Sequence, residues 1–372
     1  MQFLVVGAGA VGTYIGAFLG RSGQLVSIIG RPPVVEALNR RERGLQVVMP
    51  NGSTWHTQNY RAVASFEDAC VSSGLFGPPY DAILLCVKAY DVREVVRELS
   101  NRSGNLCYAH GDPVGRTAYL CFQNGVGSEG IVAQEFGAES VLAATTTNPL
   151  TVPEPGVARL EQTRGAVCIA PLKSTSRVIP DTSYSRQREL LLISLKGAFF
   201  DLHRMTDGRA LKWSKMLLNM MGNATSAILD LPPADIYGNR LLFSYEMSAL
   251  REAVCVVRSL GLRAVNLPGY PARILSWAVR FVPNDVLKPI LSRQVALGRG
   301  GKWPSFYYDV HNQKHQCEVD WLNGAVVRYG KRTGVPTPVN KHLVEVLRGL
   351  VQGSENPEEW NGQVEKLLKG PN

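Results

Sequence analysis

Residues 1–20 of the chain, MQFLVVGAGAVGTYIGAFLG, join an apolar run to three closely spaced glycines. Residues 2–6 predict a buried strand, and the pattern after the glycines predicts a helix. Strand, glycine-rich turn and helix in this order are typical of a dinucleotide-binding unit, with a turn that binds no ligand as the alternative. Gly7 would allow the tight turn, Gly9 would let a pyrophosphate approach the backbone, and Gly12 would let the helix pack closely on the strand. The helix N-terminus would offer N–H groups to the anion.

The second predicted strand, residues 25–29, ends in Gly30-Arg31. NAD-specific proteins usually place an acidic residue at this point, on the ribose hydroxyls, and this chain has none there. A guanidinium can instead hold a 2′-phosphate through two parallel hydrogen bonds, so Arg31 favours NADPH as the cofactor. An exposed loop arginine beside an NAD or flavin site is the alternative.

Short β-branched runs alternate with helical patterns through the first two hundred residues, which predicts a parallel sheet covered by helices. The strands are expected at residues 2–6, 25–29, 82–87, 118–122, 141–145 and 167–170. From about residue 207 onward the pattern is helical, with almost no strand signal. The sequence therefore predicts an α/β Rossmann N-terminal domain over residues 1–204, followed by an all-α C-terminal domain over residues 205–372.

Amphipathic stretches predict the helices of the second domain. They are expected at residues 210–229, 241–260, 273–282, 320–333 and 340–352. A polar, loosely held tail is expected over residues 353–372.

Two polar residues each follow a predicted strand of the first domain. Lys88 comes after residues 82–87, and Asn124 comes after residues 118–122. Ligands of such sheets lie at the carboxyl ends of the strands, so Lys88 is a candidate for the cofactor and Asn124 for the nicotinamide ribose or the substrate. Each alone is more often an ordinary loop residue.

The predicted helix over residues 210–229 carries Lys215, Asn219 and Asn223 at i, i+4 and i+8. These three residues would share one face, while Lys212 lies on another. Reduction of a carbonyl group needs an acid that protonates its oxygen, and a lysine ammonium is available at neutral pH. Beside a nicotinamide site, Lys215 is the candidate acid. The polar side of an amphipathic helix is the alternative.

Two further candidates lie near the C-terminus. Ser305 follows Trp303-Pro304, and Glu318 follows Cys317 just before a predicted helix. Their hydroxyl and carboxylate suit the carboxylate and the hydroxyl of a small organic acid. The alternative for Glu318 is a first-turn acid that stabilises the helix dipole.

Composition limits the other function classes. The net charge of +9 comes from lysines and arginines spread along the chain, which suits small anionic ligands better than nucleic acid. The seven scattered cysteines form no CxxC pair, which predicts reduced thiols, a cytoplasmic location and no bound metal. His311 and His315 lack the glutamate of a zinc-binding helix, so a polar loop is expected there. No apolar run approaches about 20 residues, and no membrane association is expected.

Together these motifs resemble the ketopantoate reductases, which reduce 2-dehydropantoate to pantoate in pantothenate and coenzyme A biosynthesis. The resemblance covers nearly the whole chain, and it rests on residues 7–12 (GAGAVG), 215–223 (Lys-x-x-x-Asn-x-x-x-Asn), 318–324 (Glu-x-Asp-x-x-Asn-Gly) and 334–340 (GVPTPVN). It implies an NADP-dependent oxidoreductase of the 2-dehydropantoate 2-reductase type.

The resemblance also implies roles for single residues. Lys215 looks like the family's general acid, and Asn219 and Asn223 look like the amides that support it and the substrate. Glu318 looks like the carboxylate that binds the substrate hydroxyl, and Ser305 like the residue near the substrate carboxylate. Lys215, Asn219 and Glu318 are thus the expected catalytic residues.

On the cofactor side, Asn124 looks like the amide beside nicotinamide and substrate, and Arg31 and Lys88 match the pair that faces the adenosine phosphate. The chain departs from the family on the substrate side. Residues 306–308 are Phe-Tyr-Tyr where the biosynthetic enzymes commonly have Met-Leu-Gln, and Cys317 replaces the usual Thr. These changes concern the identity of the keto acid and leave NADPH-linked reduction unaffected.

The expected activity is therefore NADPH-dependent reduction of a small 2-keto acid, foremost 2-dehydropantoate, by a monomer or homodimer. One alternative is a reductase of another branched or aromatic 2-keto acid on the same scaffold. A non-catalytic NADPH-binding regulatory protein is the alternative from another class, and a proton donor such as Lys215 argues against it.

Overall fold

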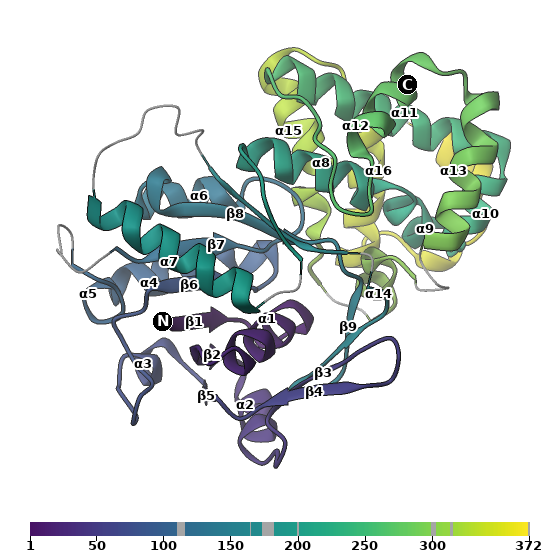
Figure 1. Cartoon of the computed structure of the whole chain (residues 1–372). Coiled ribbons are helices and arrows are strands. Elements are labelled where there is room, and N and C mark those ends of the chain that lie inside the picture. The colour runs from purple at the N-terminus through teal and green to yellow at the C-terminus, as the bar shows by residue number, and fades with distance from the viewer. Residues whose placement is uncertain are drawn as a thin grey trace. The chain divides into compact units, whose positions relative to one another are not determined.

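The computed structural model describes residues 1–109, 116–163, 165–172, 182–198, 201–298, 303–312 and 315–370. Two compact units make up the chain (Figure 1). The first unit consists of Met1–Gln123 and Ser128–Leu211, and the second consists of Asn124–Gly127 and Lys212–Asn372. The predicted boundary after residue 204 stays a prediction.

An eight-stranded sheet forms the centre of the first unit (Figure 1). In spatial order its strands are β12 (Leu202–Arg204), β11 (Val167–Pro171), β8 (Val141–Thr146), β7 (Ala118–Cys121), β6 (Ala82–Leu85), β1 (Gln2–Val6), β2 (Leu25–Ile29) and β5 (Tyr60–Val63). All neighbours are parallel except β8 and β11. Parallel strands with helical crossovers confirm the predicted α/β Rossmann class.

Both faces of the sheet are buried, because alternate residues of each apolar strand enter different cores. In β1, Phe3 and Val5 belong to one apolar core, whereas Leu4 and Val6 belong to the other. Helices α1 (Ala10–Arg21), α2 (Pro32–Asn39) and α7 (Thr182–Ala198) contribute to the first core. The second contains residues of α3 (Phe66–Ala69), α4 (Val92–Asn101), α5 (Ser103–Leu106) and α6 (Ser128–Phe136).

A second sheet of four strands packs on α1, and sequence analysis did not predict it. Its order is β4 (Thr54–Thr57), β3 (Leu45–Val48), β10 (Val157–Leu160) and β9 (Leu150–Glu154). The strands have only four or five residues, and β4 and β9 are largely exposed. Such short, half-polar runs give a weak strand pattern.

The second unit is helical, as predicted. Its helices are α8 (Gly208–Met220, which begins in the first unit), α9 (Asn223–Leu229), α10 (Pro233–Gly238), α11 (Arg240–Ser259), α12 (Ala272–Phe281), α13 (Asn284–Gly298), α14 (Ser305–His311), α15 (Asn323–Thr333), α16 (Pro338–Gln352) and α17 (Val364–Leu368). A 3₁₀ helix, η3 (Glu318–Trp321), precedes α15. None of the described helices is both long and apolar enough to span a membrane.

Two predictions for this unit are wrong. The continuous helix over residues 210–229 is broken after Met220, where Gly222 has a φ of 62° and caps α9. Glycine adopts this left-handed conformation at little cost, so the chain can turn there. The expected loose tail instead packs on the unit, since Trp360 and Leu367 are buried. Two apolar side chains suffice to hold this short polar segment.

Candidate active site

The glycine-rich turn has the geometry that a bound dinucleotide needs. Gly7 has a φ of 108°, and a Cβ added to Gly12 would lie 1.9 Å from the Gly7 carbonyl oxygen. Both glycines are therefore required by the turn and by the close packing of α1. Gly9 differs, because a Cβ there would meet no atom of the described residues within 4 Å. The space over Gly9 is open to a ligand.

The N-terminus of α1 begins in this turn. Gly9 is its N-cap and has no side chain to satisfy the first backbone N–H groups. Residues 10–13 of the first turn include no acidic residue. The positive end of the helix dipole thus faces an anion site without a competing carboxylate, and the turn fits a pyrophosphate.

Lys88 lies at the position in the sheet where ligands of this fold bind. The strand order runs outward from β1 to β2 in one direction and from β6 to β7 in the other, so β1 and β6 flank the switch point. Gly7 follows β1, and Lys88 follows β6 as the half-buried N-cap of η1 (Ala89–Asp91). A Cβ on Gly7 would lie 2.9 Å from the Val87 nitrogen, so the segment that leads to Lys88 packs on the turn.

Gln123 was missed by sequence analysis. Its buried side-chain amide donates hydrogen bonds to the carbonyl oxygens of Leu85 (2.8 Å) and Val87 (3.2 Å). It therefore ties the end of β7 to the segment before Lys88. A polar residue directly after a fully buried strand was the available signal.

Arg31, the candidate contact for a 2′-phosphate, lies at the start of α2. It is exposed, follows β2 and Gly30, and is the N-cap of α2, with extended backbone at φ −63° and ψ 148°. Pro32 opens α2, and its fixed φ suits the first helical position. The guanidinium is thus presented from the ordered start of a helix.

In the second unit, the loop Asn124–Gly127 is anchored to η3. The Val126 N–H donates to the Trp321 carbonyl oxygen at 3.0 Å, and Gly125 has a φ of 79°. A Cβ on Gly125 would lie 2.2 Å from that same oxygen. The turn that carries Asn124 is therefore held against the 3₁₀ helix that begins with Glu318.

The structure brings together the amides of Asn124 and Asn219. The Asn219 Nδ2 donates to the Asn124 Oδ1 at 3.0 Å. The Asn124 Nδ2 and the Asn219 Oδ1 take no part in this bond. The pair therefore offers hydrogen-bond donors as well as an acceptor. Lys215 lies one helical turn before Asn219 on α8, and its side chain is half-buried.

Tyr270 is a further residue that sequence analysis did not identify. The Lys215 Nζ lies 5.6 Å from the centre of its ring, within the range of a cation–π contact. The segment that carries Tyr270 is fixed by paired backbone bonds between Leu267 and Tyr270. It is also tied to α8, because the Val265 N–H donates to the Ser214 hydroxyl at 2.8 Å. These contacts orient the ammonium of Lys215.

Asn223 and Ser305 form a second cluster. Asn223 is 4% exposed, and its Oδ1 accepts the Phe306 N–H at 3.1 Å. Its Nδ2 donates to the Ser305 hydroxyl oxygen at 3.4 Å. Because α8 ends at Met220, Asn223 does not continue the helical row of Lys215 and Asn219. Its role is to hold the start of α14.

Glu318 is a buried carboxylate, 2% exposed, at the first position of η3. The helix predicted over residues 320–333 begins later than expected, because the separate 3₁₀ helix η3 comes first and α15 begins only at Asn323. Burial raises the pKa of the neighbouring Cys317 thiol to about 12, which keeps this cysteine neutral and unreactive.

The described residues contain no cluster of ligands suited to a metal ion, and all seven cysteines are free thiols. His315 lies outside any helix, as expected, but His311 ends α14. The predicted loop is therefore wrong for His311, because its ring stacks on Tyr307 and extends the helix.

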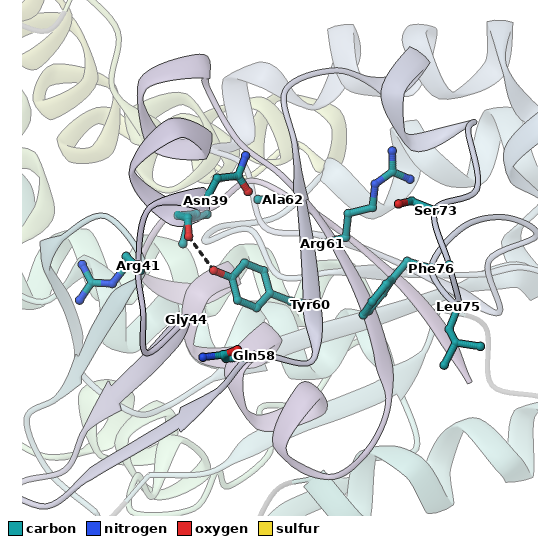
Figure 2. A pocket seen from close by; sticks show the side chains of 12 residues that line it. Asn39, Arg41, Gly44, Gln58, Tyr60, Arg61, Ala62, Ser73, Leu75 and Phe76 are labelled. Carbon is teal, nitrogen blue, oxygen red and sulfur yellow. Dashed lines mark hydrogen bonds between the residues drawn. The ribbon is translucent and has the colours of Figure 1, made fainter.

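A pocket of about 470 Å³ lies in the first unit beside β5 (Figure 2). Tyr60 stands at its centre and donates a hydrogen bond to the Leu38 carbonyl oxygen at 2.8 Å. Figure 2 shows Arg41 and Arg61 on opposite sides of this ring. Arg41 binds Glu154, and Arg61 donates to the carbonyl oxygens of Val71 and Asp68. Protein acceptors thus engage both guanidinium groups, and none of the predicted site residues lines this pocket.

Comparison with known proteins gives consistent matches. The family model "Ketopantoate reductase PanE/ApbA" matches residues 3–174, and its C-terminal counterpart matches residues 207–351. A 2-dehydropantoate 2-reductase of Halobacterium salinarum is 26% identical over 94% of this chain and 98% of that protein.

Solved structures agree on the fold. A PanE/ApbA family ketopantoate reductase from Ralstonia eutropha JMP134 has a TM-score of 0.73 at 23% identity, covering 96% of this chain and all of that one (100%). A D-mandelate dehydrogenase in complex with NADH and anilino(oxo)acetate has a TM-score of 0.71 at 21% identity, covering 95% of this chain and 99% of that one. Because the two family models together span both units, the chain belongs to the ketopantoate reductase family of oxidoreductases.

Proposed function

We propose that this protein reduces a small 2-keto acid with NADPH, and that 2-dehydropantoate is its first candidate substrate. The observation that carries the proposal is the arrangement of the second unit. A lysine, an amide pair and a buried carboxylate come from segments far apart in the sequence, and hydrogen bonds and a cation–π contact hold these segments together. Cytoplasmic location is proposed from the seven free thiols.

The first unit suits the cofactor. Its open Gly9, the uncapped start of α1 and the exposed Arg31 offer backbone N–H groups to a pyrophosphate and a guanidinium to a 2′-phosphate. Lys88 adds a second cation at the switch point. NADPH, when bound, supplies the hydride for the reduction.

Lys215 is the proposed proton donor. Carbonyl reduction turns the keto oxygen into an alkoxide, and an ammonium group near that oxygen stabilises the charge and delivers the proton. The ring of Tyr270 and the neighbouring turn restrict where the Nζ of Lys215 can lie. The amide pair of Asn219 and Asn124 is proposed to bind the keto acid beside it.

The remaining groups are proposed to orient the acid. Ser305, held by Asn223 at the start of α14, would donate to the substrate carboxylate. Glu318 would accept a hydrogen bond from the substrate hydroxyl. Both contacts would favour a small hydroxylated acid, because a substrate that lacks the carboxylate or the hydroxyl would form one hydrogen bond fewer.

The test is NADPH oxidation by the purified protein with 2-dehydropantoate and a panel of other 2-keto acids. The expected result is turnover of 2-dehydropantoate with NADPH preferred over NADH. Stoichiometric NADPH binding without turnover of any keto acid would overturn the proposal in favour of a regulatory protein.

A bulkier, aromatic 2-keto acid is the second candidate. Tyr308 lies one helical turn after Ser305 on α14, and its side chain is 41% exposed. Residues i and i+3 share a helix face, so this ring extends the side on which Ser305 lies. The comparable fold of a D-mandelate dehydrogenase agrees with this possibility. Phenylglyoxylate turnover that Tyr308→Leu selectively lowers would favour this candidate over 2-dehydropantoate.

A further inference from the structure

One buried carboxylate of the second unit has no part in the proposed binding of cofactor or substrate. Glu246 lies in the middle of α11 and is 3% exposed. Its Oε2 accepts the Gly222 N–H at 2.8 Å and the Tyr237 hydroxyl at 3.4 Å, and its Oε1 accepts the Thr225 hydroxyl. A charged group this deeply buried persists only where several donors compensate its lost hydration.

Two of these donors belong to the break between α8 and α9. Gly222 is the left-handed N-cap of α9, and Thr225 lies in its first turn. The start of a new helix leaves its first backbone N–H groups without carbonyl partners. The carboxylate of Glu246 receives one of them, so it stabilises the broken form of this segment over a continuous helix.

The break determines where the Asn223 side chain lies. In a continuous helix, Asn223 would stand one turn after Asn219 on the same face. In the structure it begins a new helix, and its amide instead binds the Ser305 hydroxyl and the Phe306 N–H. The start of α14, and with it Ser305, therefore depends on the break.

We propose that Glu246 is a positioning residue for the substrate side of the site, acting through Gly222, Thr225 and Asn223 on Ser305. The proposal rests on the proposed function, because it assumes that Ser305 binds the keto acid. Glu246 itself touches neither substrate nor cofactor. The Glu246 carboxylate stabilises the break between α8 and α9. The break sets the position of the Asn223 side chain, and Asn223 in turn positions the Ser305 hydroxyl.

The chain offers a matched control in the same helix. Glu252 of α11 also accepts hydrogen bonds, from the Val339 N–H and the Asn340 N–H at 2.9 Å each, and burial raises its pKa. Those donors belong to the start of α16 and not to the break. Glu246→Gln and Glu252→Gln make the same chemical change at a buried and at a half-buried anchor of one helix.

The experiment compares steady-state kinetics of the two variants, with Tm as the measure of folding. Glu246→Gln is expected to raise the KM for the keto acid and lower kcat/KM on the order of 10-fold or more, since small misplacements of binding groups are costly. NADPH affinity should not change. Glu252→Gln, at a similar loss of Tm, should keep its KM.

Thr225 provides an independent route if Glu246→Gln does not fold. Thr225→Val removes one donor and keeps the carboxylate, so it should raise KM in the same direction, while Thr225→Ser should restore the wild-type value. Equal KM values in wild type, Glu246→Gln and Thr225→Val would overturn the proposal. So would parallel losses in Glu246→Gln and Glu252→Gln.

Hydrogen exchange at the Phe306 amide separates this proposal from the proposed function. Asn223 accepts that N–H, so Glu246→Gln should speed its exchange and Glu252→Gln should not. Faster exchange in a wild type that reduces no keto acid would keep the positioning role and reject the function. Unchanged exchange would reject the positioning role whatever the activity.

Discussion

At the scale of single residues, Lys215 and Lys212 show how burial separates two lysines of one helix. Lys212 is 3% exposed, whereas Lys215 is half-buried beside Tyr270. Truncation of Lys212 would therefore leave a cavity in the interior, which is destabilising whatever its chemistry. A neutral control for Lys215 must come from the surface, and Lys331 in the last turn of α15 is exposed.

Lys215→Ala is expected to lower kcat by on the order of 10²- to 10⁴-fold, because it removes the proposed proton donor to the developing alkoxide. NADPH affinity should stay the same, since the proposed cofactor groups belong to the first unit. Lys331→Ala is the control and should match wild type. A Lys215→Ala enzyme within a fewfold of wild-type kcat would show that the proton comes from another group.

Arg31→Asp is expected to weaken NADPH binding by roughly 10- to 100-fold and to spare NADH, since it would remove the proposed charge-assisted bond to the 2′-phosphate and add repulsion. Fluorescence titration with each cofactor measures the change. Arg43→Asp, at another exposed arginine of the same unit, is the control. A variant that still prefers NADPH would move the phosphate contact away from Arg31.

Glu318→Gln is expected to raise the KM for the keto acid with little change in NADPH affinity, because the carboxylate is proposed to bind the substrate hydroxyl. Asp320→Asn is the control in the same 3₁₀ helix, since Asp320 binds Arg348 at 2.8 Å on the surface. Unchanged kinetics in a stable Glu318→Gln enzyme would assign Glu318 to a purely structural role.

At the scale of elements, the three glycines of the glycine-rich turn are needed for different reasons. Gly7 and Gly12 are demanded by the protein itself, because each added Cβ would overlap backbone atoms. Gly9 is not, because a Cβ there points into open space. We therefore expect that the close approach of the pyrophosphate, and not the fold, requires a glycine at position 9.

This difference predicts opposite outcomes for two alanine substitutions. Gly12→Ala should lower the free energy of unfolding by about 3 kcal/mol or more, since the strand and α1 must separate to admit the methyl group. Gly9→Ala should keep the wild-type Tm without ligand and lose most NADPH affinity. Thermal unfolding with and without NADPH measures both the change in stability and the loss of NADPH binding. A Gly9→Ala protein that binds NADPH normally would contradict the assigned approach of the pyrophosphate.

At the scale of the whole molecule, ligand binding and stability are linked. NADPH at a hundredfold excess over its Kd should stabilise the folded protein by about 2.7 kcal/mol, because only the folded first unit binds it. At the same NADPH concentration, the 10- to 100-fold weaker binding expected of Arg31→Asp should reduce this stabilisation to about 0.4–1.4 kcal/mol, whereas Glu318→Gln should keep it in full. An equal reduction in both variants would contradict the separation of cofactor and substrate groups.

What could be predicted from the sequence depended on how far apart in the sequence the interacting residues lie. The GAGAVG turn follows from steric demands within a dozen residues, so it was predicted together with the α/β class and the family, and these are confirmed. The break at Gly222 depends on Glu246 in another helix, and no local pattern reveals that contact. The pairing of Asn124 with Asn219 is equally long-range.

The anchoring of Asn124–Gly127 to Trp321 has a consequence for how the chain matures during synthesis. The ribosome finishes the strands of the first unit long before it adds Trp321, so the loop Asn124–Gly127 can be anchored only after Trp321 has been synthesised. Contacts between residues so distant in sequence form late, because closing a long loop is entropically costly. A nascent chain that has just completed its Rossmann sheet should therefore bind NADPH before it can hold a keto acid.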